Sequence, residues 1–182
     1  MSIKLRIISG ELKGRKIEAP KGDNVRPTSD KVKEAIFSML TNSIYDEVVI
    51  DVFAGTGNLG LEAISRGAKH CYFGDKSRES LGFIKSNIKH CKVEDRATII
   101  AGDYTSVLKK VPVKAGVILL DPPYLDGLMV SCIELISELD LLQEDGVIVA
   151  EHSLMEKLPE EIGKYSLIKE RRYGKIAVSI YG

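Results

Sequence analysis

The sequence lacks several features that mark particular classes of protein. It has only three cysteines, none of them in a C-x-x-C pair, and an odd number does not build a disulfide framework. We therefore expect reduced thiols. The pairs His70-Cys71 and His90-Cys91 lack the short spacing of zinc ligands, so we expect no metal.

Long apolar runs are also missing. No run approaches the roughly 20 residues that span a bilayer, and the first four residues do not begin a signal peptide. We therefore expect a cytoplasmic protein with no membrane partner. Hydrophobic residues make up 44% and charged residues 29% of the chain, which is ordinary for a soluble globular protein.

The net charge is zero as well, because 26 basic residues balance 26 acidic ones. A zero net charge argues neither for nor against binding of nucleic acid. The distribution is uneven, since residues 1–33 hold nine basic and four acidic residues. Clustered cations release counterions from a polyanion, so this segment is a candidate phosphate-binding surface, although a solvated basic face explains the charge as well. The candidate substrate contacts here are Arg6, Arg15, Lys16, Arg26, Thr28 and Lys33.

From residue 46 onward, short apolar runs alternate with helical patterns, which predicts repeated β-α units and a parallel sheet. The expected strands are 48–52, 70–74, 97–101, 117–120 and 146–151, and the expected helices are 59–66, 78–89, 105–110 and 128–139. Two further apolar stretches, 165–168 and 176–181, should pair as an antiparallel hairpin around Tyr173-Gly174. The fold class is therefore α/β.

Residues 1–45 have a different pattern and form a predicted N-terminal extension to the main unit, 46–182. Strands over 4–8 and 15–18 should make a small hairpin, followed by a Gly- and Pro-containing loop. Thr28 or Ser29 then caps a helix with apolar residues at helical spacing. Phe37 lies off that stripe, so it faces either a neighbouring loop or a second packing surface.

A glycine-rich turn joins the strand at 48–52 to the next helix. Gly55 and Gly57 allow unusual backbone angles and close approach of a ligand. The spacing Gly55-x-Gly57-x-x-Gly60, with Asp75 twenty residues later, also fits a dinucleotide-binding fingerprint. We favour S-adenosylmethionine, because the Asp51 carboxylate would repel a pyrophosphate and attract an ammonium or sulfonium group.

The remaining cofactor contacts follow the next two strands. Asp75 can accept hydrogen bonds from ribose hydroxyls, and Asp103 either accepts one from the adenine amino group or caps the helix that follows it. The predicted cofactor-binding residues are Asp51, Phe53, Ala54, Gly55, Thr56, Gly57, Leu59, Asp75, Lys76, Asp103 and Tyr104.

The most specific motif is Asp121-Pro122-Pro123-Tyr124, directly after a predicted parallel strand. Ligands of open parallel sheets bind at the carboxyl ends of the strands, so Asp121 should face the same crevice as the glycine turn. The Asp121 carboxylate and the Pro122 carbonyl can accept both protons of a planar amino group and favour charge developing on its nitrogen. Tyr124 would stack on the base, and Pro123 is a candidate substrate contact.

These motifs resemble the RsmD family of bacterial 16S ribosomal RNA (guanine-N2)-methyltransferases over essentially the whole chain. The similarity lies in Arg26-Pro27-Thr28-Ser29-Asp30 and its helix, in residues 51–60 and in residues 121–124. The resemblance implies a Class I, Rossmann-like, doubly wound sheet of seven strands with the last antiparallel. It also implies methylation of the guanine N2 in ribosomal RNA, free or within an assembled small subunit, by a monomer.

Two other functions stay open on the sequence alone. The same acceptor geometry serves any planar amino group, so the substrate could be a DNA adenine or a protein glutamine. A non-catalytic RNA-binding assembly factor with a vestigial cofactor fold is the alternative outside enzymes.

Overall fold

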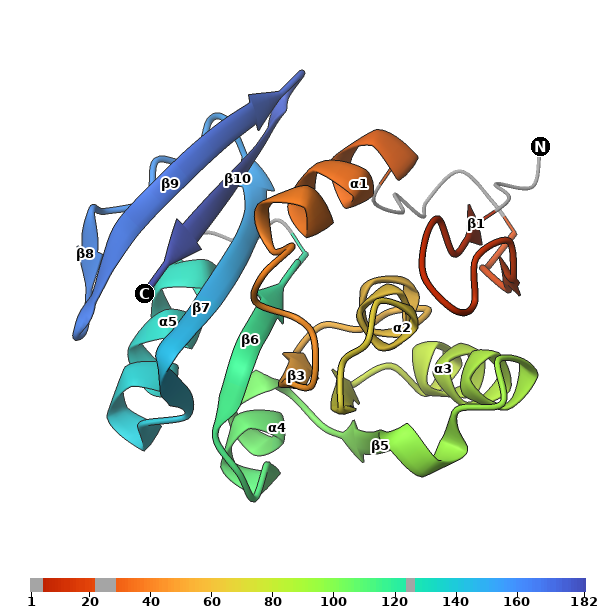
Figure 1. Cartoon of the computed structure of the whole chain (residues 1–182). Helices are drawn as coiled ribbons and strands as arrows, with labels where there is room; N and C mark the ends of the chain where they lie inside the picture. The colour runs from red at the N-terminus through yellow and green to blue at the C-terminus, as the bar shows by residue number, and fades with distance from the viewer. Residues whose placement is uncertain (1–4, 22–28, 124–126) are drawn as a thin grey trace.

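The computed structural model describes residues 5–21, 29–123 and 127–182 (Figure 1). Its N-terminal part contains β1 (Leu5–Arg6), β2 (Lys16–Ile17) and α1 (Asp30–Met39). The repeated units that follow are β3 (Val48–Asp51), α2 (Asn58–Ser65), β4 (His70–Asp75), α3 (Arg78–His90), the 3-10 helix η1 (Glu94–Arg96), β5 (Ala97–Ala101), α4 (Tyr104–Lys110), β6 (Ala115–Leu120) and α5 (Leu128–Leu139). The chain ends with β7 (Leu142–Ser153), β8 (Glu161–Ile162), β9 (Tyr165–Tyr173) and β10 (Ile176–Tyr181).

The main sheet has the order β5-β4-β3-β6-β7-β10-β9-β8. The neighbouring pairs from β5 to β7 are parallel, whereas β10 runs antiparallel to both β7 and β9. All six residues of β6 are buried, as expected for a central parallel strand that is covered on both faces. The predicted parallel sheet and the C-terminal hairpin, which turns after Tyr173, are confirmed.

The strand count differs from the expected seven, because the described part of this sheet has eight strands. The addition is β8, whose residues Glu161 and Ile162 pair with Ser166 and Tyr165 across a tight turn. Gly163 occupies that turn at φ 60°, a left-handed conformation that favours glycine. Two paired residues are too few to give a strand pattern in the sequence.

Helices cover both faces of the sheet, which confirms the doubly wound architecture. One hydrophobic cluster joins α1, α2 and α3 to one face, and a second joins α4 and α5 to the other. Leu5, Ile17 and Ile36 belong to the first cluster, so the N-terminal extension packs on the same core as α2 and α3. No helix within the described residues could cross a membrane.

The N-terminal extension forms the predicted hairpin and helix. Leu5 pairs with Ile17 and Arg6 with Lys16 in an antiparallel arrangement. Ser29 caps α1 by accepting a hydrogen bond from the Val32 backbone at 3.2 Å. The other cap candidate, Thr28, lies outside the described residues.

Candidate active site

The glycine turn after β3 has the conformation that its sequence requires. Gly55 and Gly57 have φ angles of 60° and 86°, and Gly57 is the N-cap of α2. A Cβ atom on Gly60 would lie 2.3 Å from Cε1 of Phe73, so only glycine lets α2 approach β4 this closely. A Cβ atom on Gly55, in contrast, would meet no atom within 4 Å. The backbone of Gly55 therefore faces open space.

A cavity of about 380 Å³ lies at the carboxyl ends of the parallel strands, a size typical of small-molecule sites. Eight predicted residues line it, and they come from the turns after β3, β4, β5 and β6: Phe53, Gly55, Asp75, Lys76, Asp103, Tyr104, Asp121 and Pro123. Four residues that were not predicted complete the lining: Val52, Ser77, Gly102 and Leu128. Pro122 does not line the cavity. Five of the predicted cofactor-binding residues do not line it either: Asp51, Ala54, Thr56, Gly57 and Leu59.

Asp75 connects two of these turns. Its carboxylate accepts hydrogen bonds from the Gly55 backbone N–H and from the Ser77 backbone N–H, each at 2.9 Å. These bonds fix the glycine turn against the end of β4. A carboxylate offers about four acceptor positions, so Asp75 retains capacity for hydroxyl groups of a ligand.

Asp103 caps α4, which was one of its two predicted roles. Its Oδ1 atom accepts from the Ser106 backbone N–H at 2.9 Å and from Thr105 Oγ1 at 2.6 Å. The hydrogen bond from Thr105, followed by that from Ser106, lowers the pKa of this carboxyl group. Asp103 also lines the cavity, so its contact with an adenine amino group stays a prediction.

Two aromatic side chains form part of the cavity wall. The rings of Phe53 and Tyr104 lie 6.4 Å apart between centroids and are tilted by 40°. Tilted pairs at this distance are favourable and give a rigid apolar surface. Such a surface suits the flat face of a purine.

Asp51, which was predicted to bind the cofactor, does not line the cavity. The side chain is 1% exposed, and its Oδ2 atom accepts from the Gly60 backbone N–H at 3.0 Å. Burial raises its pKa to about 7; the Gly60 hydrogen bond opposes this rise, while Asp121 and Asp75 add to it. Asp51 therefore holds the start of α2 and influences the cavity through its charge.

Asp121 follows directly after β6 and lines the cavity with Pro123. Its negative charge is close enough to contribute to the raised pKa of Asp51. The D-P-P segment and the glycine turn therefore meet at one cavity, as the sequence predicted. Tyr124 lies outside the described residues.

This arrangement agrees with comparisons to known proteins. A family model described as "Conserved hypothetical protein 95" matches residues 5–182. The chain belongs to this family. A "Putative rRNA methyltransferase YlbH" of Bacillus subtilis (strain 168) is 40% identical over 181 residues, covering 97% of this chain and 98% of the relative.

Other members of the family carry related names. "Ribosomal RNA small subunit methyltransferase D" of Escherichia coli (strain K12) is 31% identical, with 97% of this chain and 89% of the relative covered. A solved structure titled "Putative methyltransferase yhhF from Escherichia coli" has a TM-score of 0.88 at 30% identity, covering 98% of this chain and 97% of that one. These names agree with the resemblance found in the motifs.

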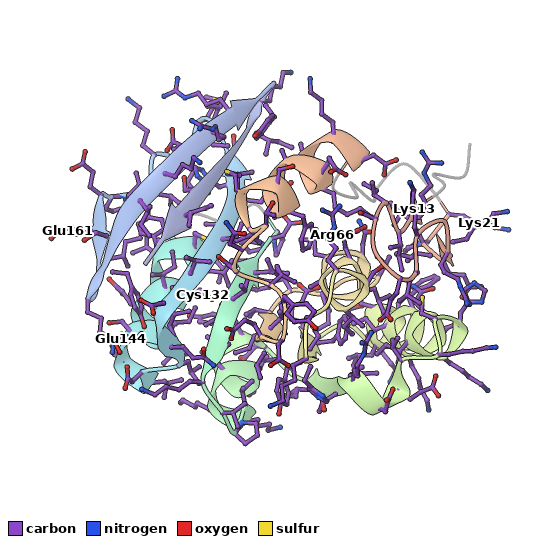
Figure 2. All side chains as sticks on the ribbon, viewed as in Figure 1. Lys13, Lys21, Arg66, Cys132, Glu144 and Glu161 are labelled. Atoms are coloured by element: carbon purple, nitrogen blue, oxygen red, sulfur yellow. The ribbon has the colours of Figure 1, made fainter. Side chains whose placement is uncertain are left out.

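The predicted substrate contacts of the N-terminal extension do not all have the same surroundings. Arg6, Arg15 and Lys16 are exposed on the N-terminal hairpin, and Arg26 and Thr28 lie outside the described residues. Arg6 has an ion pair with Asp30 at 3.6 Å, and Arg15 donates to the His90 carbonyl at 3.3 Å. Figure 2 labels two further lysines of this extension, Lys13 and Lys21.

Lys33 is buried, so its prediction as a phosphate contact was wrong. Its Nζ atom donates to the Arg6 carbonyl at 2.6 Å and to Asn58 Oδ1 at 2.8 Å, and it pairs with Glu62 at 3.1 Å. Burial lowers its pKa, although Glu62 opposes that shift. Its side chain cannot reach RNA from this position.

Phe37 shares the face of α1 that carries Lys33, which resolves the question of its surroundings. The guanidinium carbon of Arg66, a residue labelled in Figure 2, lies 4.9 Å from the centre of the Phe37 ring. This second packing surface of α1 faces α2. The i, i+4 spacing of Asn58, Glu62 and Arg66 was the sequence signal for a polar partner face on α2.

Two residues that position the site were missed by the sequence reasoning. Glu62 accepts hydrogen bonds from the backbone N–H groups of Ile8 and Ser9, at 2.9 and 3.1 Å. Asn87 on α3 accepts from the Glu18 N–H at 2.8 Å and donates to the Glu18 carbonyl at 3.0 Å and to the Thr56 carbonyl at 2.9 Å. These buried side chains hold the N-terminal extension against the glycine turn.

Proposed function

We propose that this protein transfers a methyl group from S-adenosylmethionine to the N2 amino group of a guanine in small-subunit ribosomal RNA. The observation that carries this proposal is the meeting of Asp121 and Pro123 with Asp75 and Gly55 at one cavity. The names of the relatives support ribosomal RNA as the substrate.

The residues of the cavity fit the cofactor. In this proposal Asp75 accepts from ribose hydroxyls, and Phe53 and Tyr104 form an apolar wall against adenine, which their place in the cavity lining supports. The open space at Gly55 lets the methionine part lie against the backbone. When bound, S-adenosylmethionine supplies an electrophilic methyl group.

The D-P-P segment acts on the other reactant. The Asp121 carboxylate and the Pro122 carbonyl accept the two protons of the guanine amino group, which orients its nitrogen toward the methyl group. The same acceptors stabilise the positive charge that develops on the nitrogen. Asp121 is also placed to receive the proton that this nitrogen finally loses. Tyr124 stacks on the base in this proposal, and Pro123 borders it.

The N-terminal hairpin supplies the RNA contacts in this proposal, through Arg6, Arg15 and Lys16, with Arg26 and Thr28 nearby in sequence. The protein acts as a monomer in the cytoplasm, on free RNA or on an assembled small subunit. No three His, Cys, Asp or Glu side chains within the described residues are grouped as metal ligands, and the proposed chemistry requires none.

Mass spectrometry of ribosomal RNA nucleosides tests the proposal. Cells without the gene should lose one N2-methylguanosine from the small-subunit RNA, and the wild-type gene should restore it. A gene encoding Asp121→Ala should not restore it. Unchanged N2-methylguanosine, with loss of a methylated adenine in DNA or of a methylated protein glutamine, would instead identify one of the alternative substrates.

A further inference from the structure

The strands β7, β9 and β10 extend beyond the end of β6 on the edge of the sheet that carries the cavity. Leu120, the last residue of β6, pairs with Ala150, and β7 continues through Ser153. At about 3.3 Å per residue, these three further residues extend roughly 10 Å past Leu120. β10 pairs with β7 as far as Ser153, and β9 pairs with β10 along the same length. The three strands therefore project together past the end of β6, where Asp121 follows.

Residues 169–175, the end of β9 and the turn into β10, carry an excess of positive charge, and we call this segment the hairpin tip. Glu170 is the one carboxylate of this segment. Its four cations are all exposed: Lys169, Arg171, Arg172 and Lys175. Several side chains with nitrogen at their ends surround this hairpin in Figure 2. Residues 34–182 as a whole carry more acidic than basic residues. A positive tip on such a body is therefore a distinct local feature.

Glu170 neutralises only part of this charge. Arg172 has its Nε atom 3.5 Å from Glu170, yet its side chain stays 73% exposed. Glu170 also accepts from Ser179 Oγ at 3.3 Å, which directs it toward β10. The hairpin backbone is already ordered, so anion binding restricts the side chains of these cations but not the chain that carries them.

An exposed apolar side chain lies beside the hairpin tip. The loop after β7 is joined to the tip by a hydrogen bond from the Leu154 N–H to the Lys175 carbonyl at 3.0 Å. The next residue, Met155, is 93% exposed. A thioether makes favourable contacts with flat aromatic faces, and unstacked RNA bases present such faces.

The charged residues on β9 have an alternative explanation, which is protection of an exposed edge of the sheet. Among the described residues, β8 pairs with Tyr165 and Ser166 and the Leu167 N–H donates to the Glu160 carbonyl, so no strand covers the edge of β9 beyond Leu167, and charges there oppose aggregation. Edge protection requires neither an excess of one sign nor its placement at the end nearest the cavity. The two explanations also predict different effects of substitution.

We propose that the hairpin tip binds phosphates of the RNA substrate, on the opposite side of the cavity from the N-terminal hairpin. This inference rests on the proposed function, because it requires an RNA substrate. The N-terminal hairpin packs beside α3 through Asn87, near β4 and β5, whereas the hairpin tip extends from the β7 side of the sheet (Figure 1). RNA contacts on both sides hold the target nucleotide over Asp121.

A triple variant, R171Q/R172Q/K175Q, tests the proposal. Its matched control removes three exposed lysines at the amino-end edge of the sheet, K69Q/K109Q/K110Q. Binding of deproteinised small-subunit ribosomal RNA and of assembled small subunits is measured over a salt series. Each phosphate contact contributes about 0.7–0.9 to the slope of log affinity against log salt, so the tip variant should flatten it by about two to three units. The control should retain the wild-type slope.

The outcomes separate this inference from the proposed function. A wild-type slope for the tip variant on both probes overturns the inference, and wild-type methylation of RNA then leaves the proposed function standing. Weaker binding to assembled subunits alone, at an unchanged salt slope, identifies a protein contact and also overturns it. Aggregation of the tip variant with unchanged RNA affinity supports edge protection instead. Failure of the wild-type protein to methylate RNA removes the proposed function itself.

Discussion

The Nζ atom of Lys33 lies 3.1 Å from Oε1 of Glu62, and neither side chain is exposed to solvent. The pair joins α1 to α2, and the same Glu62 carboxylate accepts hydrogen bonds from the backbone of Ile8 and Ser9. A buried ion pair of this kind is costly to break, because Glu62 would keep only Arg66, at 2.9 Å, as a cationic partner. The pair therefore fixes the N-terminal extension to the helix that begins at the glycine turn.

Replacing Lys33 with Met should lower the free energy of unfolding, but by less than the about 3–5 kcal/mol of a buried charge left wholly unpaired, because Glu62 keeps Arg66 Nε at 2.9 Å. Urea denaturation measures this change. The salt dependence of RNA binding, determined below the unfolding transition, should stay at the wild-type value. A flattened salt dependence with unchanged stability would return Lys33 to the RNA surface.

Lys33 also illustrates where sequence reasoning reached its limit. The pattern around α1 correctly predicted a helix with an apolar stripe, because spacing alone determines which residues share a face. It could not show that Lys33 lies on a second buried face, because that depends on Asn58 and Glu62 of another helix. Long-range polar contacts leave a weak trace in one sequence.

The residues of the cavity also divide into those that local motifs predicted and those that depend on long-range contacts. Local motifs predicted Asp75, Asp103 and Asp121 as cavity residues, because each lies at the end of a parallel strand or within two residues of it, and such strand ends share one edge. The role of Asn87 was not predictable, since its amide contacts Glu18 and Thr56, which are distant in sequence. Asp51 was placed at the correct turn, but burial directs it to Gly60.

Asp121→Ala should abolish methyl transfer while leaving the Kd for S-adenosylmethionine within about tenfold of wild type, because the proposed contact of Asp121 is with the acceptor amine. Single-turnover methylation and calorimetry measure the two effects. Asp126→Ala is a control in the same segment of the sequence. Wild-type turnover by Asp121→Ala would exclude the assigned role.

Asp75→Ala should weaken the binding of S-adenosylmethionine by roughly 1–3 kcal/mol, since ribose hydroxyls would lose a charged acceptor. Calorimetry with the demethylated product, S-adenosylhomocysteine, should show the same loss. Part of this loss of affinity will come from disturbance of the glycine turn, because Asp75 also accepts from the Gly55 N–H. Asp75→Asn keeps one acceptor oxygen and should lose less affinity. An unchanged Kd in both variants would place the ribose contact elsewhere.

The buried Asp51 carboxyl group should make stability depend on pH. Its pKa is about 7 in the folded protein and near 4 in an unfolded chain, so the folded state binds the extra proton between these values. The stabilising contribution is complete below pH 4 and is lost as pH rises through 7. Asp51→Asn retains an acceptor for Gly60 and removes the titration.

Melting temperatures of the wild type and of Asp51→Asn should therefore converge at low pH and differ most above pH 7, where the variant is the more stable. The lowered pKa of His70 acts with the opposite sign, because burial disfavours its charged form, but it is common to both proteins. A constant difference across the pH range would mean that Asp51 titrates normally.

The last prediction concerns Arg6, Arg15 and Lys16, the exposed cations of the N-terminal hairpin. If they bind RNA phosphates, replacing all three with Gln should flatten the salt dependence of RNA affinity by up to about three slope units and leave cofactor affinity unchanged. If Arg6 only pairs with Asp30, the variant should lose a little thermal stability instead, because exposed ion pairs contribute about 0–1 kcal/mol. Measuring RNA affinity across a salt series and the melting temperature on the same variant distinguishes these roles. A wild-type salt slope would assign these cations to the docking of the hairpin, and the substrate would then have to be held by other residues around Asp121.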